Sequence, residues 1–244
     1  MVPFGDIFAR MTDSTDLILV TGPMVTTSAW GSTADHLRKS GWCVHVPEVI
    51  KDKSKPPAWN AWPSLVEQSM PACDRPILVG FSAATTVIAA LANRIPVRAL
   101  LLLDGAIPPD RGPTPFAHPA LRALIDGLAA ADGSVPPWSH WFKDSRRAGP
   151  AGLDELARRP GALEAFERDL PRFSISWFDD TIDLTPWRQV PAAFIRLSAF
   201  FDEAVVEAER RGWPTLRVDG THLHPGLHSD ETAQAIDSIC RQLV

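Results

Sequence analysis

A short stretch that begins as a strand and ends as a helix constrains this chain more than any other. Residues 78–84 are Leu-Val-Gly-Phe-Ser-Ala-Ala and lead into the small, apolar segment 85–92. Bulky and β-branched residues before Ser82 favour a buried strand, whereas the alanines after it favour a helix. A strand that turns at a serine into a helix presents one hydroxyl above the sheet and directs backbone N–H groups there. The stretch nearly matches G-x-S-x-G, with Ala84 as the second glycine, and predicts a nucleophile on an α/β fold. A short Ser-x-Ala-Ala segment also occurs in ordinary helices.

The rest of the chain alternates strands with helices, which predicts a mostly parallel central sheet flanked by helices. At 244 residues the chain is long enough for one large α/β domain. The segments with strand composition are 17–20, 43–46, 77–81, 97–103, 192–197 and 215–218. Helical segments are expected at 32–40, 62–70, after Ser82, and at 204–211 and 231–243.

The pattern changes between residues 107 and 189, where prolines cluster, helices are expected at 120–131 and 153–170, and no convincing buried strand occurs. Because about eighty residues are too many for a simple crossover, we expect a helical cap at 107–189 over a core made of 1–106 and 190–244. The cap is dense in aromatic residues. Trp138, Trp141 and Trp177 are the candidates for binding an apolar or aromatic substrate, although such rings also form a cap's own core.

A serine nucleophile needs a base, and the histidines after the last predicted strand are the candidates. His222 follows Gly220 and Thr221 at the end of that strand, which would face it toward Ser82. His224 is the alternative base. A metal site made by His222, His224, His228 and Asp230 is disfavoured because Pro225 interrupts any helical spacing. No metal is therefore expected.

Two aspartates compete to orient the histidine. Asp202 follows the strand at 192–197, whereas Asp104 ends the strand at 97–103. Asp202 is favoured because it follows its strand at a point well placed to reach a histidine on the next loop. Each has a structural alternative, because Asp202 can cap the next helix and Asp104 can stabilise the turn at Gly105. Either choice preserves the chain order Ser, Asp, His.

The amino-acid composition of the chain excludes some classes of binding partner. The chain has 24 Lys and Arg, 29 Asp and Glu and a net charge of −5, with no basic block, which argues against nucleic acid. Three widely spaced cysteines predict buried thiols in a reducing compartment. Residues 1–16 mix charges with short apolar stretches, unlike a signal peptide, and no stretch reaches transmembrane length. A cytoplasmic protein without a membrane partner is expected, and no tyrosine is available for catalysis.

Over nearly its full length the sequence resembles the α/β-hydrolase superfamily, especially its small esterases and hydroxynitrile-lyase-like members. The resemblance rests on Thr21-Gly22 after the first strand, Ala29-Trp30, the turn at Ser82, the long 107–189 segment and Gly220-Thr221-His222. It implies a cofactor-free enzyme with a Ser–His–Asp triad. One position departs from the pattern: the residue after Thr21-Gly22 is Pro23, which has no N–H to donate to an oxyanion. Ala83 is expected as one donor and Met24 as the second, with the N–H of Val25 or the hydroxyl of Thr26 or Thr27 as the alternatives to Met24.

The leading functional prediction is therefore a carboxylesterase or lactonase that acts through Ser82, His222 and Asp202. Two alternatives remain at this point. A lyase or cyclase on the same fold would use Ser82 and His222 as acid and base, and a non-catalytic member would only bind an apolar ligand. Neither the substrate's identity nor the oligomeric state is indicated by the sequence.

Overall fold

The centre of the molecule is a six-stranded parallel sheet. The computed structural model describes residues 15–142 and 146–244. In spatial order the strands are β10 (Thr215–Arg217), β9 (Ala192–Arg196), β4 (Ala99–Leu103), β3 (Ile77–Phe81), β1 (Asp16–Val20) and β2 (Cys43–His45). All five pairings between neighbours are parallel. The predicted fold class is confirmed, and each predicted strand lies within two residues of its observed bounds.

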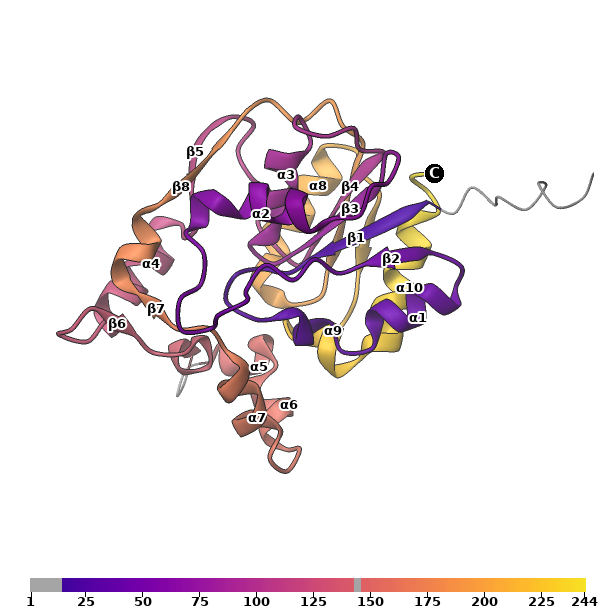
Figure 1. Ribbon diagram of the computed structural model, residues 1–244. Helices are drawn as coiled ribbons and strands as arrows, with labels where there is room; N and C mark the ends of the chain where they lie inside the picture. Colours follow the sequence, from indigo (N-terminus) through magenta and orange to yellow (C-terminus); the bar gives the residue numbers. More distant parts are fainter. Residues whose placement is uncertain (1–14, 143–145) are drawn as a thin grey trace, which may run out of the picture.

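Helices cover both faces of this sheet. They are α1 (Thr33–Lys39), α2 (Trp62–Ser69), α3 (Ala84–Leu91), α8 (Asp202–Arg210), α9 (His224–Leu227) and α10 (Ser229–Cys240). The pair α1 and α10 packs on one face, and α2 and α3 pack together on the other, as Figure 1 shows. Every residue of β3, β4 and α3 is buried. Because these strands are covered on both faces, they have continuous apolar sequences rather than alternating ones.

Most of residues 107–189 lie beyond the ends at which the sheet strands finish, whereas the last strand of the segment packs beside α3 (Figure 1). Their helices are α4 (Pro119–Leu128), α5 (Ala148–Ala151), α6 (Leu153–Ala157) and α7 (Ala162–Asp169). Their strands form two antiparallel pairs, β5 (Gly112–Pro115) with β8 (Thr181–Leu184) and β6 (Ser134–Val135) with β7 (Phe173–Ser174).

Two short strand pairs accompany the helices of this segment. β5 and β8 pair although β5 contains Pro113 and Pro115, because proline is tolerated in such edge strands and hides their sequence signal. The single helix expected at 153–170 is divided. Pro160 and Gly161, the latter with a φ of 71°, separate α6 from α7 because neither residue continues a helix well.

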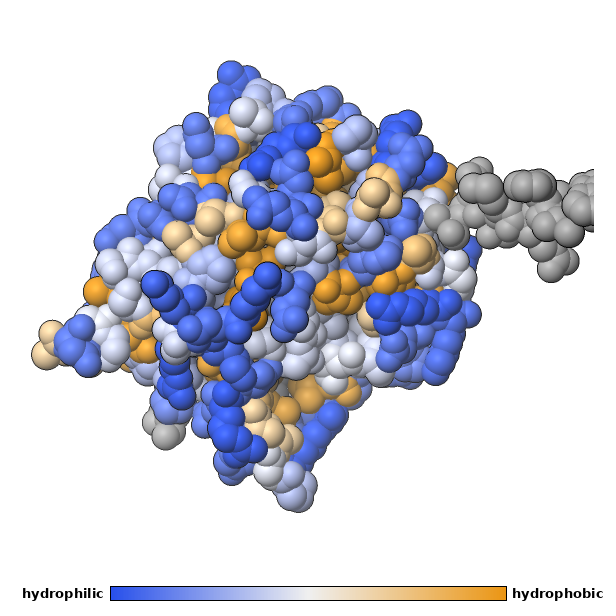
Figure 2. All heavy atoms as spheres, in the orientation of Figure 1, coloured by the Kyte–Doolittle hydropathy of each residue, from blue (hydrophilic) through white to orange (hydrophobic). Residues whose placement is uncertain are grey.

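The outer surface mixes polar and apolar side chains. Figure 2 shows hydrophobic patches set among hydrophilic residues on one face, and α7 has no buried residue. Within residues 15–142 and 146–244, no helix combines the length and apolar character that a bilayer crossing needs. Residues 1–14, on which most of the signal-peptide prediction depends, lie outside the described part of the chain.

Candidate active site

Ser82 occupies a sharp turn between β3 and α3. Its φ is 59°, in the left-handed region that a non-glycine residue adopts at a cost of about 1–3 kcal/mol. The Ser82 N–H donates to the carbonyl of Leu103 at 3.0 Å, which ties the turn to the end of β4. A Cβ atom at Gly80 would lie 2.7 Å from the carbonyl oxygen of Ala84, so the strand and helix approach each other as the motif requires. The local sequence therefore produces the expected turn.

The neighbouring strand ends in a second strained residue. Asp104 follows β4 with a φ of 44°, and Gly105 comes next. A Cβ atom at Gly105 would overlap the carbonyl oxygen of Ser82 and lie 2.5 Å from Thr85 Cγ2. Only glycine permits the Asp104 turn and the Ser82 turn to pack this closely.

Replacing Gly105 with alanine is therefore expected to destabilise the fold by about 3 kcal/mol, the upper end of the range for overpacking. Gly127 is the matched control, because an added Cβ there meets no atom within 4 Å and the residue lies within α4. Gly127→Ala should leave stability unchanged or raise it by up to about 1 kcal/mol. Chemical denaturation measures both changes. An unchanged midpoint for Gly105→Ala would contradict the close packing of the two turns.

A chain of hydrogen bonds joins Ser82, His222 and Asp104. His222 Nε2 lies 3.0 Å from Ser82 Oγ, and its Nδ1 lies 2.7 Å from Asp104 Oδ2. With Asp104 charged, Nδ1 carries the proton and Nε2 presents its lone pair to the serine hydroxyl. This arrangement is able to remove a proton from Ser82.

Asp104 is completely buried, yet its carboxylate is fully satisfied. Oδ1 accepts hydrogen bonds from the backbone N–H groups of Leu197 and Ser198, each at 2.7 Å. Oδ2 accepts a hydrogen bond from Ser198 Oγ at 2.7 Å in addition to the one from His222. A buried charge requires such partners, and here they also hold the carboxylate in place beneath the imidazole.

Asp202 does not contact His222, which corrects the preferred sequence assignment. Its side chain is 54% exposed and receives a hydrogen bond from Arg196 Nε at 2.8 Å. Asp202 is the first residue of α8, six positions beyond the end of β9, and Arg196 at that strand end attracts its carboxylate. The competing candidate, Asp104, lies on the strand next to β3 and is the one brought to the histidine.

The other histidines near the C-terminus are not gathered around Ser82. The His224 ring is buried and stacks on His228 with ring centroids 4.6 Å apart, and its Nε2 lies 3.3 Å from Glu231 Oε2. Burial and the nearby His228 lower the pKa of His224. His224 therefore belongs to the packing of α9 and α10, and it shares no common ligand position with His222.

Aromatic rings and residues 150–151 hold His222 in position. Phe81 and Phe201 lie 4.9 Å and 5.7 Å from the imidazole, centroid to centroid, and Trp138 lies at 6.0 Å. The backbone N–H of His222 donates to the carbonyl of Pro150 at 2.8 Å, and that of Leu223 donates to the carbonyl of Ala151 at 3.2 Å. The 107–189 segment thus contributes directly to the placement of the histidine.

A cavity of about 590 Å³ opens above Ser82 and His222. Its walls come from both parts of the chain and are mostly apolar. Residues that line it include Pro23, Met24, Ala83, Phe116, Leu121, Trp138, Trp141, Phe142 and Arg147. Two of the three predicted tryptophans therefore face the cavity.

Trp177 is not one of its lining residues. Its Nε1 donates to the carbonyl of Pro57 at 2.7 Å, and its ring packs 4.7 Å from Phe173 and 5.1 Å from Phe178. These contacts place Trp177 where the 107–189 segment packs on itself and against residue 57 of the core. Trp177 thus has a packing role, which is the alternative that the sequence allows for the aromatic residues of the cap.

The two predicted oxyanion donors also border the cavity. Ala83 follows Ser82, and Met24 follows Pro23 on the loop after β1. In the part of the chain that the structure describes, neither backbone N–H donates a hydrogen bond. A Cβ atom at Gly22 would lie 3.5 Å from Ala83 N, so this loop lies against the Ser82 turn. Ala83 N thus lies beside the loop after β1, and Met24 on that loop borders the same cavity.

Sequence reasoning missed Ser198 and the two phenylalanines at 200 and 201. Ser198 binds the buried carboxylate, whereas Phe200 and Phe201 pack on His222 at 6.2 Å and 5.7 Å. Their position could have identified them, because all three residues follow a strand expected to end at the same edge as Ser82. On the sequence alone, only Asp202 of this loop is predicted as a site residue.

Comparison with known proteins finds likeness in structure only. No protein-family model matches the sequence, and no curated protein matches it either. An extracellular α/β-hydrolase from a Paenibacillus species superposes with a TM-score of 0.68 at 18% identity, covering 92% of this chain and 98% of the other. A pyrethroid hydrolase from Sphingobium faniae gives 0.64 at 18%, with coverages of 92% and 96%. Tomato methylketone synthase I, bound to 2-tridecanone, gives 0.66 at 14%, with coverages of 95% and 99%.

Proposed function

The chain has the α/β-hydrolase fold, and on that basis we propose that it is a serine hydrolase of carboxylic esters or lactones. The observation that carries the proposal is the hydrogen-bonded series Ser82–His222–Asp104 at the floor of a mostly apolar cavity. Ser82 is the nucleophile, His222 the base and Asp104 the residue that orients the imidazole. This series has the geometry on which serine hydrolysis depends.

In the proposed reaction, Ser82 Oγ attacks the ester carbonyl while its proton passes to His222 Nε2. The tetrahedral intermediate collapses as the carbon–oxygen bond to the alcohol breaks, and the imidazolium returns the proton to that leaving oxygen. Water, deprotonated by His222, then attacks the acyl-enzyme and releases the acid and free Ser82. The N–H groups of Ala83 and Met24 are the proposed donors to the oxyanion, because Pro23 has none.

Residues 107–189 are proposed to act as a cap that selects the substrate. Trp138 and Trp141 of this segment line the cavity together with Met24 of the core. A volume of about 590 Å³ with mostly apolar walls suits a small apolar or aromatic substrate.

A fluorophosphonate probe tests the proposal. It should label the protein once, with loss of fluoride, and peptide mass spectrometry should locate the adduct on Ser82. Ser176→Ala, which removes an exposed serine of the 107–189 segment, is the control and should label as fully as the wild type. Heat-denatured protein should not label, because activation needs the folded triad. An adduct on another serine, or no adduct on folded protein, would contradict a serine hydrolase.

Pro23 favours one second candidate, a cofactor-free lyase or cyclase in which no tetrahedral oxyanion forms. Ser82 and His222 would then move protons without a covalent intermediate. A second experiment separates the two: a hydrolase accumulates an acyl-enzyme on Ser82 when mixed rapidly with an activated aryl ester, whereas a lyase does not. Intact-mass measurement detects that species directly.

A further inference from the structure

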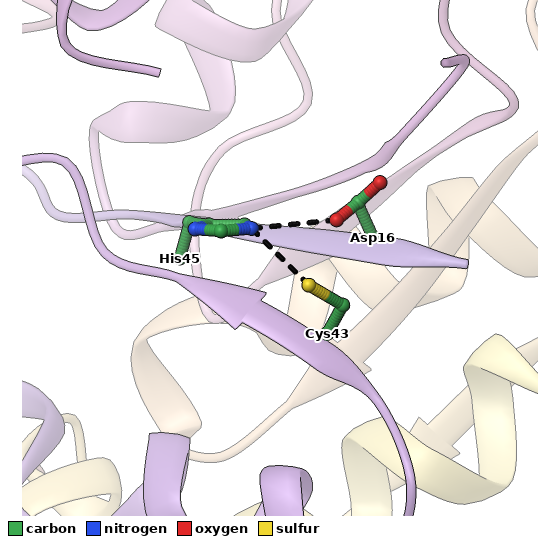
Figure 3. A group of neighbouring side chains, drawn as sticks. All are labelled: Asp16, Cys43 and His45. Carbon is green, nitrogen blue, oxygen red and sulfur yellow. Dashed lines mark hydrogen bonds and ion pairs between the residues drawn. The ribbon is translucent and has the colours of Figure 1, made fainter. Parts of the chain in front are cut away.

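Three side chains with metal-binding atoms lie together on β1 and β2, near the end of the sheet opposite to Ser82. Asp16 begins β1 and pairs in register with Cys43, the first residue of β2. His45 is two residues beyond Cys43, so both project from the same face of the strand. Figure 3 shows the His45 imidazole directed at both of the other groups. Their ligand atoms all lie within 4.8 Å of one another.

The hydrogen bond between His45 and Asp16 is long. His45 Nε2 lies 3.3 Å from Asp16 Oδ1 and 3.3 Å from Cys43 Sγ. A protonated Nε2 and the Cys43 thiol could both donate to the Asp16 carboxylate, which leaves no bond between the nitrogen and the sulfur. An unprotonated Nε2 could accept from the thiol, but would then oppose its lone pair to the carboxylate. The nitrogen–oxygen distance also exceeds the usual range of about 2.7–3.2 Å for such bonds.

The same distances fit tetrahedral coordination. With zinc bonds of about 2.0–2.3 Å, adjacent ligand atoms are separated by about 3.4 Å for nitrogen and oxygen and about 3.5 Å for nitrogen and sulfur. We propose that Asp16, Cys43 and His45 form a binding site for a divalent transition-metal ion, Zn²⁺ in preference to Mg²⁺ or Ca²⁺. Thiolate and imidazole ligands select zinc over these harder cations.

The cluster is open to solvent. Cys43 and Cys73 are only half-buried, contrary to the sequence expectation, and the His45 side chain is 34% exposed, so an ion has access from solvent.

This site is separate from the proposed hydrolase centre. Leu17, next to Asp16, pairs with Ile77 at the start of β3, whereas Ser82 follows the end of that strand. Five residues of strand separate the two levels by about 16 Å. The proposed ion would join β1 to the edge strand β2 and take no part in chemistry at Ser82.

Cobalt substitution tests the site. Titration of the metal-free full-length protein with Co²⁺ should produce the intense visible bands of tetrahedral cobalt and a thiolate-to-cobalt charge-transfer band, both abolished by stoichiometric Zn²⁺. Cys43→Ser should remove the charge-transfer band, and His45→Asn should weaken Zn²⁺ binding by more than about 100-fold, beyond the loss typical of an outer-shell partner. The matched controls are Cys240→Ser and His36→Asn. Cys240 is fully buried, and burial raises the pKa of its thiol to about 12.

Three results would overturn the proposal: no charge-transfer band in the wild type, a band that persists in Cys43→Ser, or equal Zn²⁺ affinity in His45→Asn and His36→Asn. Circular dichroism of each metal-free variant checks folding, and His45→Asn keeps the test decisive if Cys43→Ser does not fold. Ser82→Ala should bind Zn²⁺ as the wild type does. Failure of the metal site would therefore leave the proposed hydrolase untouched, and the converse also holds.

Discussion

Replacing Ser82 with alanine is expected to lower kcat for hydrolysis of an aryl ester by about 10⁶-fold, because loss of the nucleophile alone removes almost everything the triad contributes. The structure also indicates that this substitution removes the hydroxyl without disturbing the turn. The Ser82 hydroxyl contacts His222 Nε2 at 3.0 Å, and the backbone bond from Ser82 N to Leu103 is retained by alanine. Initial rates on an activated aryl ester, measured beside circular dichroism, provide the test.

Ser176→Ala serves as the control here too, since this exposed serine lies outside the cavity lining. Its rate should match the wild type. Substrate or product should still bind to Ser82→Ala with similar affinity, because the cavity walls are unchanged. Activity of Ser82→Ala within about tenfold of the wild type would be inconsistent with a nucleophilic serine, which supplies several orders of magnitude.

Asp104→Asn is expected to lower kcat by about 10⁴-fold, while Asp202→Asn should leave it close to the wild-type value. The asparagine oxygen can still accept the N–H groups of Leu197 and Ser198. Its NH₂ group would then face His222 Nδ1, so the imidazole would hold its proton on Nε2 and could no longer accept one from Ser82.

Asp202 forms a surface ion pair with Arg196, worth about 1 kcal/mol or less. The two variants make the same chemical change, so they separate the orienting carboxylate from a nearby one. A larger rate loss for Asp202→Asn than for Asp104→Asn would show that the assignment of Asp104 is wrong. Thermal unfolding of both variants distinguishes lost activity from lost structure.

Much of the sheet was predictable from the sequence, because parallel strands buried on both faces have short, continuous apolar sequences. The strands within 107–189 were not. Pro113 and Pro115 in β5 obscure its β-character, and β6 has only two residues. Their pairing depends on partners about forty to seventy residues away, which no local pattern records.

The candidate site divides in the same way. Ser82 and His222 could be proposed from local features, a strand-to-helix turn and a histidine just after a strand. Trp138, Trp141 and Trp177 could not be distinguished from one another, because an aromatic residue in a cap packs equally well inward or toward a cavity. The cluster of Asp16, Cys43 and His45 was missed because its members lie on two strands whose pairing register was unknown.

The sequence by itself determined the turn at Ser82, the succession of strands and helices, and the order in which serine, aspartate and histidine occur. Each of these follows from interactions between residues close in the chain. Only the tertiary structure decided which carboxylate meets His222. Asp104 and Asp202 both follow strands that end at the same edge, but the sheet order sets β4 directly beside β3. Arg196 meanwhile holds Asp202 at the surface. The packing of the whole chain determines which strands are neighbours in the sheet. It therefore also determines which aspartate contacts the histidine.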